Sequence, residues 1–392
     1  MKVKQKMWLS SRFFPTVIPV RVTISPKSIS TQQGQHVTFT CSATGPPEPV
    51  VTWSRSQGNL PALRNVVSGG KLTIMNVTRK DSGSYVCNAT NAISGNSSSV
   101  ELKVFCSLVS INKPTSSIVL FVGQALKLLC PASAGAAVVW MYNRTRSLPQ
   151  EALIESPDTL LIPSLSKYHA GIFSCVSGNS VFLNANPSVK YPETCTTVKQ
   201  NICDLSRHYV IDPDGGQGIA PFTVYCNMTD KEGEGVTAVS HNSKNRTHVM
   251  GFEPPGSYSR DIQYSASASQ IQKLIAVSSN CEQFIKFEYK GVVLFWNGGA
   301  WGWWVTHDGK VMTYWSEASE ATQGCACRAT SSCANPQHFC NCDSNDIVWR
   351  EDSGLLTNKS HLPVSQLRFG DTGKDLEEGY HTLGNLKCYG MD

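Results

Sequence analysis

The stretch Asp81-Ser-Gly-Ser-Tyr-Val-Cys87 closes a region of short apolar runs separated by turn residues. Upstream of it, Phe39 and Cys41 alternate with polar neighbours, and Trp53 follows Cys41 by twelve residues. Alternation with a period of two is typical of strands that bury one face and expose the other. The region 21–104 is therefore predicted to be an all-β domain.

The combination of Cys41, Trp53 and the D-x-G-x-Y-x-C motif that ends at Cys87 resembles the I-set immunoglobulin (Ig) domains. The resemblance implies an Ig-like domain at 21–104, in which a Cys41–Cys87 disulfide bridges two sheets and Trp53 packs on the bridge. Tyr85, two residues before the second cysteine, would form the tyrosine corner of such a domain.

A second copy of this arrangement follows at 105–191. Cys130, Trp140 and Cys175 occur in the same order, after the turn-like segment Phe121-Val-Gly-Gln124. We therefore expect a second Ig-like domain with a Cys130–Cys175 disulfide.

The second copy departs from the first at its corner. His169 stands where the first domain has Asp81, and Phe173 stands where it has Tyr85. A missing hydroxyl removes a hydrogen bond worth about 1 kcal/mol. We expect the second domain to be the less stable of the two.

The character of the chain changes after residue 191. The motifs of this last part include Tyr209-Val-Ile-Asp-Pro-Asp-Gly-Gly216, Cys281-Glu-Gln-Phe-Ile-Lys286, Gly302-Trp-Trp-Val-Thr-His-Asp-Gly309, Cys340-Asn-Cys-Asp343 and Trp349-Arg-Glu-Asp-Ser-Gly-Leu-Leu356. Together they resemble the fibrinogen-like domain of contactin-associated proteins and, more distantly, the fibrillar-collagen C-propeptide. The resemblance implies a fibrinogen-like domain at 192–392 with a Cys195–Cys226 disulfide. The predicted fold class is mostly β: two Ig sandwiches in tandem, then a disulfide-rich α+β domain.

The resemblance does not extend to the whole architecture of that family. Contactin-associated proteins carry laminin-G and EGF modules, whereas two Ig-like domains stand here. The chain is therefore interpreted as a different assembly of known modules, and a neuronal paranodal role is not carried over to it.

Five of the fifteen cysteines lie between Cys325 and Cys342. Cysteines so close together are either thiolate ligands of zinc or members of a disulfide network. Zinc needs reduced thiols, whereas the two Ig-type cysteine pairs indicate an oxidising extracellular compartment, so we favour disulfides. The network whose pairing is left open contains Cys281, Cys325, Cys327, Cys333, Cys340, Cys342 and Cys388.

The odd total of cysteines raises the question of a link between chains. Cys106 has no counterpart in the Ig pattern, and Cys203 aligns with a collagen-propeptide cysteine that joins chains. The hypothesis is that one of them forms an intermolecular bridge and makes a homo-oligomer. The family also tends to have cysteine where Tyr289 stands, and often a cysteine pair at Phe252 and Ser257. Losing such cysteines frees or re-partners others.

Two acidic stretches are candidate calcium sites. Oxygen ligands at alternate loop positions suit Ca²⁺, which takes six to eight of them, and fibrinogen-like domains commonly hold calcium in such a place. The alternative is that these residues cap turns by accepting backbone N–H bonds. The candidate ligands are Asp343, Asn345, Asp346 and Asp352, or Asp212 and Asp214 in an earlier turn.

The aromatic run from Trp296 to Trp315 is a second candidate binding site. It holds five of the nine tryptophans, together with several glycines. Aromatic faces bind sugars or acetylated groups, and glycines permit close approach. The alternative is that these tryptophans form the core, as they more often do in a disulfide-rich domain.

Composition narrows the function classes. With 41% hydrophobic and 16% charged residues the chain is globular, and its net charge of +5 is spread without a basic block, so nucleic-acid binding is not predicted. Seven N-x-S/T acceptors support a secreted glycoprotein. They are Asn76, Asn88, Asn96, Asn143, Asn227, Asn245 and Asn358.

Residues 1–20 are a candidate degraded signal segment. Lys2, Lys4 and Lys6 precede a mostly apolar stretch that Arg12 interrupts, and no small-x-small cleavage site stands out. No apolar run of about eighteen residues occurs, so no transmembrane segment is predicted. We expect a secreted or cell-surface-associated protein.

The sequence holds no G-x-S-x-G or H-E-x-x-H motif and no glycine-rich phosphate loop, so an enzyme is not predicted. The favoured function is extracellular adhesion or recognition of cell-surface or matrix proteins, or of glycans. The alternatives are a secreted innate-immune lectin of the fibrinogen-related type and a disulfide-linked matrix component. Calcium is the only cofactor considered, and no metal site is firmly assigned.

Overall fold

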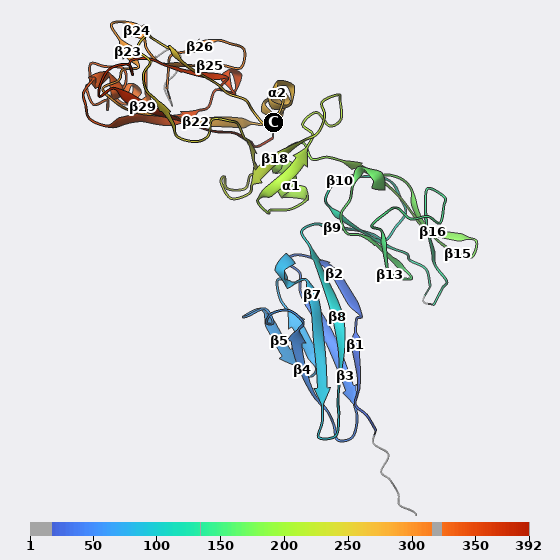
Figure 1. Ribbon diagram of the computed structural model, residues 1–392. Coiled ribbons are helices and arrows are strands. Elements are labelled where there is room, and N and C mark those ends of the chain that lie inside the picture. The colour runs from blue at the N-terminus through green and yellow to red at the C-terminus, as the bar shows by residue number, and fades with distance from the viewer. Residues whose placement is uncertain (1–17, 134, 316–323, 392) are drawn as a thin grey trace, which may run out of the picture. The chain divides into compact units, whose positions relative to one another are not determined.

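The computed structural model describes residues 18–133, 135–315 and 324–391. Strands dominate these ranges, in agreement with the predicted mostly-β fold class (Figure 1). Of the candidate signal segment 1–20, residues 1–17 lie outside the described ranges. The helices in these ranges are short, and none of them is long and apolar enough to cross a membrane.

The first sandwich consists of two four-stranded sheets, in the orders β1-β3-β6-β5 and β2-β8-β7-β4. β2 runs parallel to β8, and the other neighbours are antiparallel. The strands are β1 (Arg21–Ser25), β2 (Ser28–Gln32), β3 (Val37–Thr44), β4 (Val50–Arg55), β5 (Asn65–Ser68), β6 (Lys71–Ile74), β7 (Gly83–Thr90) and β8 (Gly95–Phe105).

The core of this sandwich follows from the period-two alternation. Phe39 and Cys41 of β3 are buried, and the disulfide from Cys41 to Cys87 joins the two sheets. Trp53 packs against Phe39 with ring centroids 6.0 Å apart, and its indole N–H donates to the carbonyl of Gly70 at 3.0 Å. Burying an aromatic side chain of this size stabilises the fold by about 2–3 kcal/mol.

The corner of the first sandwich is built around Asp81, which ends a short 3₁₀-helix, η1 (Arg79–Asp81). The Tyr85 hydroxyl donates to the Asp81 carbonyl at 2.8 Å. Arg64 donates to both carboxylate oxygens, at 2.8 and 3.0 Å. Burial would raise the pKa of Asp81, but the hydrogen bonds from Arg64 and Thr78 outweigh it and hold that pKa below its ordinary value.

The second sandwich also has two sheets, in the orders β13-β14-β11-β9 and β10-β16-β15-β12. A disulfide joins Cys130 to Cys175. The Trp140 indole donates to the carbonyl of Pro157 at 3.2 Å. The strands are β9 (Leu108–Ile111), β10 (Thr115–Phe121), β11 (Ala125–Leu129), β12 (Val139–Tyr142), β13 (Leu153–Ser156), β14 (Thr159–Ile162), β15 (Phe173–Ser177) and β16 (Ser180–Lys190).

His169 takes over part of the role that Asp81 has in the first sandwich. It ends the 3₁₀-helix η2 (Lys167–His169), and its Nδ1 accepts a hydrogen bond from the Ser166 backbone at 2.9 Å. A neutral imidazole nitrogen can accept such a bond as a carboxylate does. The cap is therefore kept although the carboxylate is lost, which the sequence comparison did not foresee.

The C-terminal part contains two larger sheets and one short hairpin, β23-β24. The larger sheet has the order β17-β18-β19-β29-β22-β27, with β20 paired to β29, and the smaller has the order β21-β28-β25-β26. The strands are β17 (Arg207–Ile211), β18 (Phe222–Asn227), β19 (Val236–Val239), β20 (Thr247–Val249), β21 (Tyr258–Asp261), β22 (Asn280–Lys290), β23 (Phe295–Trp296), β24 (Gly299–Ala300), β25 (Trp303–Val305), β26 (Val311–Met312), β27 (Arg350–Leu356), β28 (Gln366–Phe369) and β29 (Glu378–Tyr389). The helices are α1 (Cys195–Asn201), α2 (Ala268–Val277), α3 (Ala326–Ala329), η3 (Cys342–Ser344) and η4 (Lys359–His361).

An aromatic stack links the two C-terminal sheets. Phe287 of β22 and Phe369 of β28 are stacked with centroids 4.2 Å apart. Trp315 lies 5.6 Å from the Phe369 ring, and His381 of β29 is stacked on it at 5.7 Å. All four side chains are fully buried, so this stack forms the core of the C-terminal part.

The chain divides into two compact units. Segments 115–123 and 165–172 of the second sandwich belong to the unit that contains 185–391. The rest of that sandwich belongs to the unit that contains the first sandwich.

Candidate functional site

A tight hairpin in the C-terminal part carries an exposed tryptophan. β23 and β24 pair through Phe295 with Ala300 and Trp296 with Gly299. The two residues between the strands, Asn297 and Gly298, have φ of 48° and 79°. Asn-Gly is the preferred sequence for a two-residue turn with both central φ angles positive, because these residues tolerate that conformation best. The turn therefore fixes the position of Trp296.

A cavity of about 210 Å³ lies beside this hairpin. One wall is the segment Phe295–Gly298, and the other is the segment Gln337–Phe339. Trp296 is 37% exposed, and His338 meets its ring edge-on with centroids 5.7 Å apart. Nδ1 of His338 is buried and has no hydrogen-bond partner among the described residues.

The two walls are tied together by a buried carboxylate. Oδ1 of Asp343 accepts hydrogen bonds from the backbone N–H groups of Leu294 and Phe295, at 3.0 and 2.9 Å. Its Oδ2 accepts from the Cys340 backbone at 2.9 Å. Burial raises the pKa of Asp343, although these N–H groups oppose the shift. Asp343 thus holds β23 against the loop that contains His338.

Disulfides fix the second wall from the other side. Cys325 bonds to Cys340 and Cys327 to Cys333, which closes the loop that contains residues 337–339. Four of the five clustered thiols are therefore oxidised, and the zinc alternative is excluded for them because zinc binds thiolates.

The fifth clustered cysteine, Cys342, is a buried free thiol. Burial and the nearby carboxylates of Asp343 and Asp352 raise the pKa of the Cys342 thiol well above its ordinary value. Burial, Cys342 and Asp352 likewise raise the pKa of the Tyr289 hydroxyl, which donates a hydrogen bond to Asp352. Tyr289 therefore lies in the surroundings of Cys342, at the position where the resembling family tends to have cysteine.

The remaining pairs of the C-terminal part are Cys195–Cys226 and Cys281–Cys388. Cys281 and Cys388 lie directly opposite each other on β22 and β29. This bond joins two neighbouring strands of the larger sheet, near the start of β22 and the end of β29.

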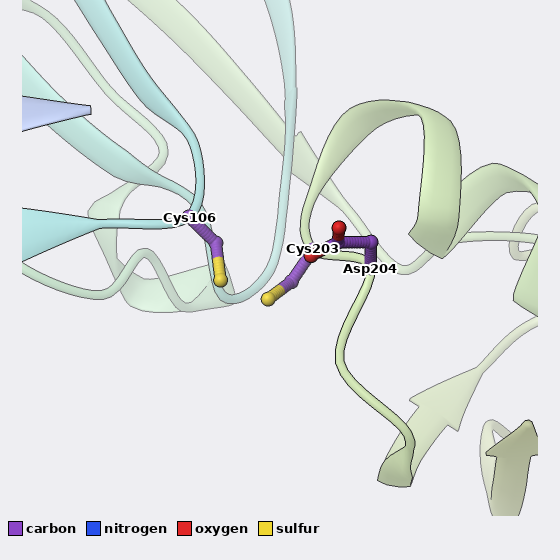
Figure 2. A group of neighbouring side chains, drawn as sticks. All are labelled: Cys106, Cys203 and Asp204. Atoms are coloured by element: carbon purple, nitrogen blue, oxygen red, sulfur yellow. The ribbon is translucent and has the colours of Figure 1, made fainter. Parts of the chain in front are cut away.

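Cys106 and Cys203, the two cysteines considered for a link between chains, are both disulfide-bonded. Cys106 directly follows β8, and Cys203 and Asp204 follow helix α1 (Figure 2). The intermolecular hypothesis was motivated by the odd total of fifteen cysteines. In the described ranges, the cysteine that stays outside the disulfides is Cys342.

The acidic residues 343–352, the candidate calcium ligands, make hydrogen bonds and an ion pair within the protein. Asp343 and Asp352 are buried and use their oxygens as acceptors for protein donors. Asp346 pairs with Arg350 at 2.6 Å, and Asn345 ends η3 with φ of 46°. Among the described residues, Asp343, Asp346 and Asp352 do not form a group whose carboxylate oxygens all lie within 4.8 Å of one another, so the geometry favours the turn-capping alternative.

The earlier acidic turn is used in a similar way. Asp214 accepts backbone hydrogen bonds from Gly216 at 3.0 Å and from Ile219 at 2.8 Å. Burial and the hydrogen bond with Asp214 raise the pKa of Asp212. Asp214 therefore caps the turn between β17 and β18, whereas Oδ1 of Asp212 is buried and has no hydrogen-bond partner among the described residues.

Three other carboxylates, those of Glu253, Asp371 and Glu377, have oxygens within 4.8 Å of one another. The Lys374 ammonium lies 2.6 Å from Glu253 and 3.3 Å from Glu377. The positive charge of Lys374 offsets the repulsion between the like-charged carboxylates. We interpret this group as an ion-pair network.

The aromatic run 296–315 divides between core and surface. Trp304 and Trp315 are fully buried, as the core alternative predicts. Trp296 alone of these three faces a cavity. Sequence analysis missed the cavity's other wall, residues 337–339, because the contacts that bring that loop to the hairpin, through Asp343, join residues almost fifty positions apart.

The candidate glycosylation sites all lie at positions where the side chain is exposed or half-buried. Asn76, Asn96, Asn143, Asn245 and Asn358 are exposed, and Asn88 and Asn227 are half-buried.

Comparison with known proteins identifies the first domain and a set of relatives. Residues 19–91 match the family model of the immunoglobulin domain. The chain is 36% identical over 190 residues to neurexin-4 of Drosophila melanogaster, which covers 46% of this chain and 15% of that protein. It is 36% identical over 203 residues to contactin-associated protein 1 of Homo sapiens, 51% of this chain and 14% of that protein. The chain is homologous to these proteins but spans only about a seventh of their length.

Solved structures similar to this chain include tandem Ig repeats. One is the tandem Ig repeats of Dlar, at 21% identity over 44% of this chain and 98% of that one, with a TM-score of 0.22. Another is a chimeric titin Z1Z2, at 24% identity over 43% of this chain and 96% of that one, with a TM-score of 0.20.

Proposed function

We propose that this protein is a non-enzymatic extracellular adhesion or recognition protein that binds cell-surface or matrix proteins. The observation that carries the proposal is the combination, in one chain, of an Ig domain with homology to neurexin-4 and contactin-associated protein 1. The six disulfides described above support it, because such bonds persist in oxidising, extracellular surroundings.

Within this proposal, the region 192–392 acts as a fibrinogen-like head and the two Ig sandwiches act as spacer and contact surface. The protein is secreted or held at the cell surface, and it is a glycoprotein at some of its seven acceptor sites. Ig sandwiches present edges and loops to protein partners, and no catalytic role is assigned to any residue.

The proposal is tested with the full chain coated on fluorescent beads. We expect the beads to aggregate with one another or to bind cells, and we expect reduced and alkylated protein to do neither. Beads that neither aggregate nor bind any cell or matrix preparation would refute the proposal.

A second candidate function is that of a secreted lectin of the fibrinogen-related type. The cavity beside Trp296 favours it, because the exposed indole and the neighbouring amide groups are chemically suited to sugars. Sugar-inhibitable agglutination of cells distinguishes this function from adhesion through protein surfaces.

A disulfide-linked matrix component is supported less well. Cys106 and Cys203, the cysteines considered for a link to a second chain, are already disulfide-bonded, and the only free thiol in the described ranges, Cys342, is buried. Non-reducing electrophoresis of the native protein decides this, since a linked matrix component runs as a dimer or larger species.

A further inference from the structure

We infer that the cavity between residues 295–298 and 337–339 binds one neutral sugar ring, with the ring stacked on Trp296. This inference rests on the lectin function proposed above and names its site and ligand class. The exposed Trp296 and the cavity beside it are features of this structure and do not depend on similarity to other proteins.

The lining residues suit a polyhydroxylated ring. An aromatic face binds the C–H side of such a ring through dispersion and burial of apolar surface. Asn297 and Gln337 are exposed, and each amide offers donors and an acceptor that match hydroxyl groups.

The lining of the cavity offers no charged partner to an ionic ligand. None of its lining residues carries a carboxylate, an ammonium or a guanidinium group. The guanidinium of Arg328 already covers the ring of Phe339, with 3.7 Å between its carbon and the ring centroid. A cation therefore finds no carboxylate and meets a like charge, and a carboxylate finds no paired donor inside the cavity.

The size of the cavity favours a single ring. A volume of about 210 Å³ is below the roughly 300–1,000 Å³ of pockets that enclose drug-sized ligands. An added Cβ at Gly298 would meet no atom within 4 Å, so the hairpin tip is open to solvent. One terminal sugar can therefore enter while the rest of a glycan stays outside.

Both walls are held in place before a ligand arrives. The Asn-Gly turn fixes one wall, the Cys325–Cys340 disulfide fixes the other, and Asp343 joins them. A rigid site loses less conformational freedom on binding, so even a small contact area gives measurable affinity.

The test uses the full chain and saturation-transfer NMR with the methyl glycosides of glucose, galactose, mannose and N-acetylglucosamine. We expect at least one of them to bind saturably with a Kd of about 1 mM, and N-acetylneuraminic acid and lysine methyl ester not to bind. Trp296→Ala should weaken binding at least tenfold, and Gln337→Ala, at an exposed position, should weaken it about threefold.

The matched control is Trp349→Ala, which removes another half-exposed tryptophan of the same part of the chain and should leave sugar binding unchanged. Circular dichroism confirms that each variant is folded. Absence of saturable binding by every neutral glycoside, preference for a charged probe, or full binding by Trp296→Ala overturns the inference. Because bead aggregation is measured on the same variants, loss of sugar binding alone leaves the adhesion proposal standing.

Discussion

The first sandwich and the C-terminal part fill their interiors with different kinds of side chain. In the first sandwich, Phe39, Trp53 and Tyr85 surround one disulfide, and the buried carboxylate of Asp81 lies at the corner, paired with Arg64. In the C-terminal part, Asp343 and His381 lie inside, fully removed from water.

This difference shows what each interior depends on. Apolar side chains tolerate one another in many arrangements, so the sandwich depends mainly on the volume that they fill. A buried carboxylate or imidazole is stable only if its partners are in place, because an unsatisfied buried polar group costs about 1–3 kcal/mol. We expect the C-terminal part to be the more sensitive of the two to single polar substitutions and to pH.

The largest effect should come from Asp343→Asn. The amide leaves one acceptor oxygen where the carboxylate had two, and it points an NH₂ group at backbone donors of Phe295 or Cys340. We expect a loss of about 3 kcal/mol in local stability, seen as roughly hundredfold faster hydrogen exchange at Leu294, Phe295 and Cys340.

Asp346→Asn is the control for this substitution. Asp346 forms an ion pair with Arg350 that is partly exposed on both sides, and pairs of this kind contribute at most about 1 kcal/mol. Equal exchange rates in the two variants would contradict the proposed anchoring role of Asp343.

The second prediction concerns acid. Burial, with Arg260 nearby, lowers the pKa of His381 to about 4, from about 6.5 in an unfolded chain. The contribution of His381 to the free energy of unfolding is fully present above pH 6.5 and is lost as the pH falls through about 4. The loss is about 3 kcal/mol. His381→Gln should remove it, as measured by denaturant unfolding of both proteins at pH 7 and pH 4.

Asp352 should act in the opposite direction. Burial raises the pKa of Asp352 to about 6, so its contribution is complete below about pH 4 and is lost as the pH rises through about 6. Asp352→Asn should therefore remove a loss of stability that occurs as the pH rises, whereas His381→Gln removes a loss that occurs as the pH falls. Variants that shift the curve in the same direction would contradict these assignments.

A smaller effect is expected in the first sandwich. Tyr85→Phe makes its corner resemble that of the second sandwich, where Phe173 stands, and removes the bond to the Asp81 carbonyl. We expect a loss of about 1 kcal/mol in the free energy of unfolding.

Tyr209→Phe provides a matched control for this prediction. The Tyr209 hydroxyl also donates to a carbonyl four residues earlier, that of Leu205, at 3.0 Å, but this bond is exposed. Water replaces an exposed partner, so the loss should stay below about 0.5 kcal/mol. A Tyr209 effect as large as the Tyr85 effect would show that burial of the corner does not matter.

The smallest effect concerns Cys342. Because its thiol is buried and its pKa is raised, it should not react with a thiol reagent in the native protein. Exactly one thiol per chain should react after unfolding without reductant, and none in Cys342→Ala. Rapid labelling of the native protein would place Cys342 at the surface instead.

The sequence identified what depends on local patterns and adjacent residues. The Cys41, Trp53 and Tyr85 pattern predicted the first sandwich because each residue occupies a fixed place on a strand. It could not show that His169 replaces Asp81 as a cap, since that depends on which ring nitrogen faces Ser166.

In the C-terminal part, composition alone could not decide between metal ligands and turn caps. Asp343 was noticed as a candidate calcium ligand, but its real partners, Leu294 and Phe295, lie almost fifty residues away in the chain. Contacts over such separations follow from the sheet order and the disulfides. Tyr289, where the resemblance implies a cysteine, was a useful signal, because it lies in the surroundings of the free thiol of Cys342.

The most direct test of this account is disulfide mapping of the native protein by mass spectrometry without reduction. The account predicts oxidised pairs in both sandwiches and in the C-terminal part, with Cys342 as the thiol that remains reduced. The predicted pairs are Cys41–Cys87, Cys130–Cys175, Cys195–Cys226, Cys281–Cys388, Cys325–Cys340 and Cys327–Cys333. Native material in which these cysteines are reduced would contradict the extracellular assignment and the proposed function together.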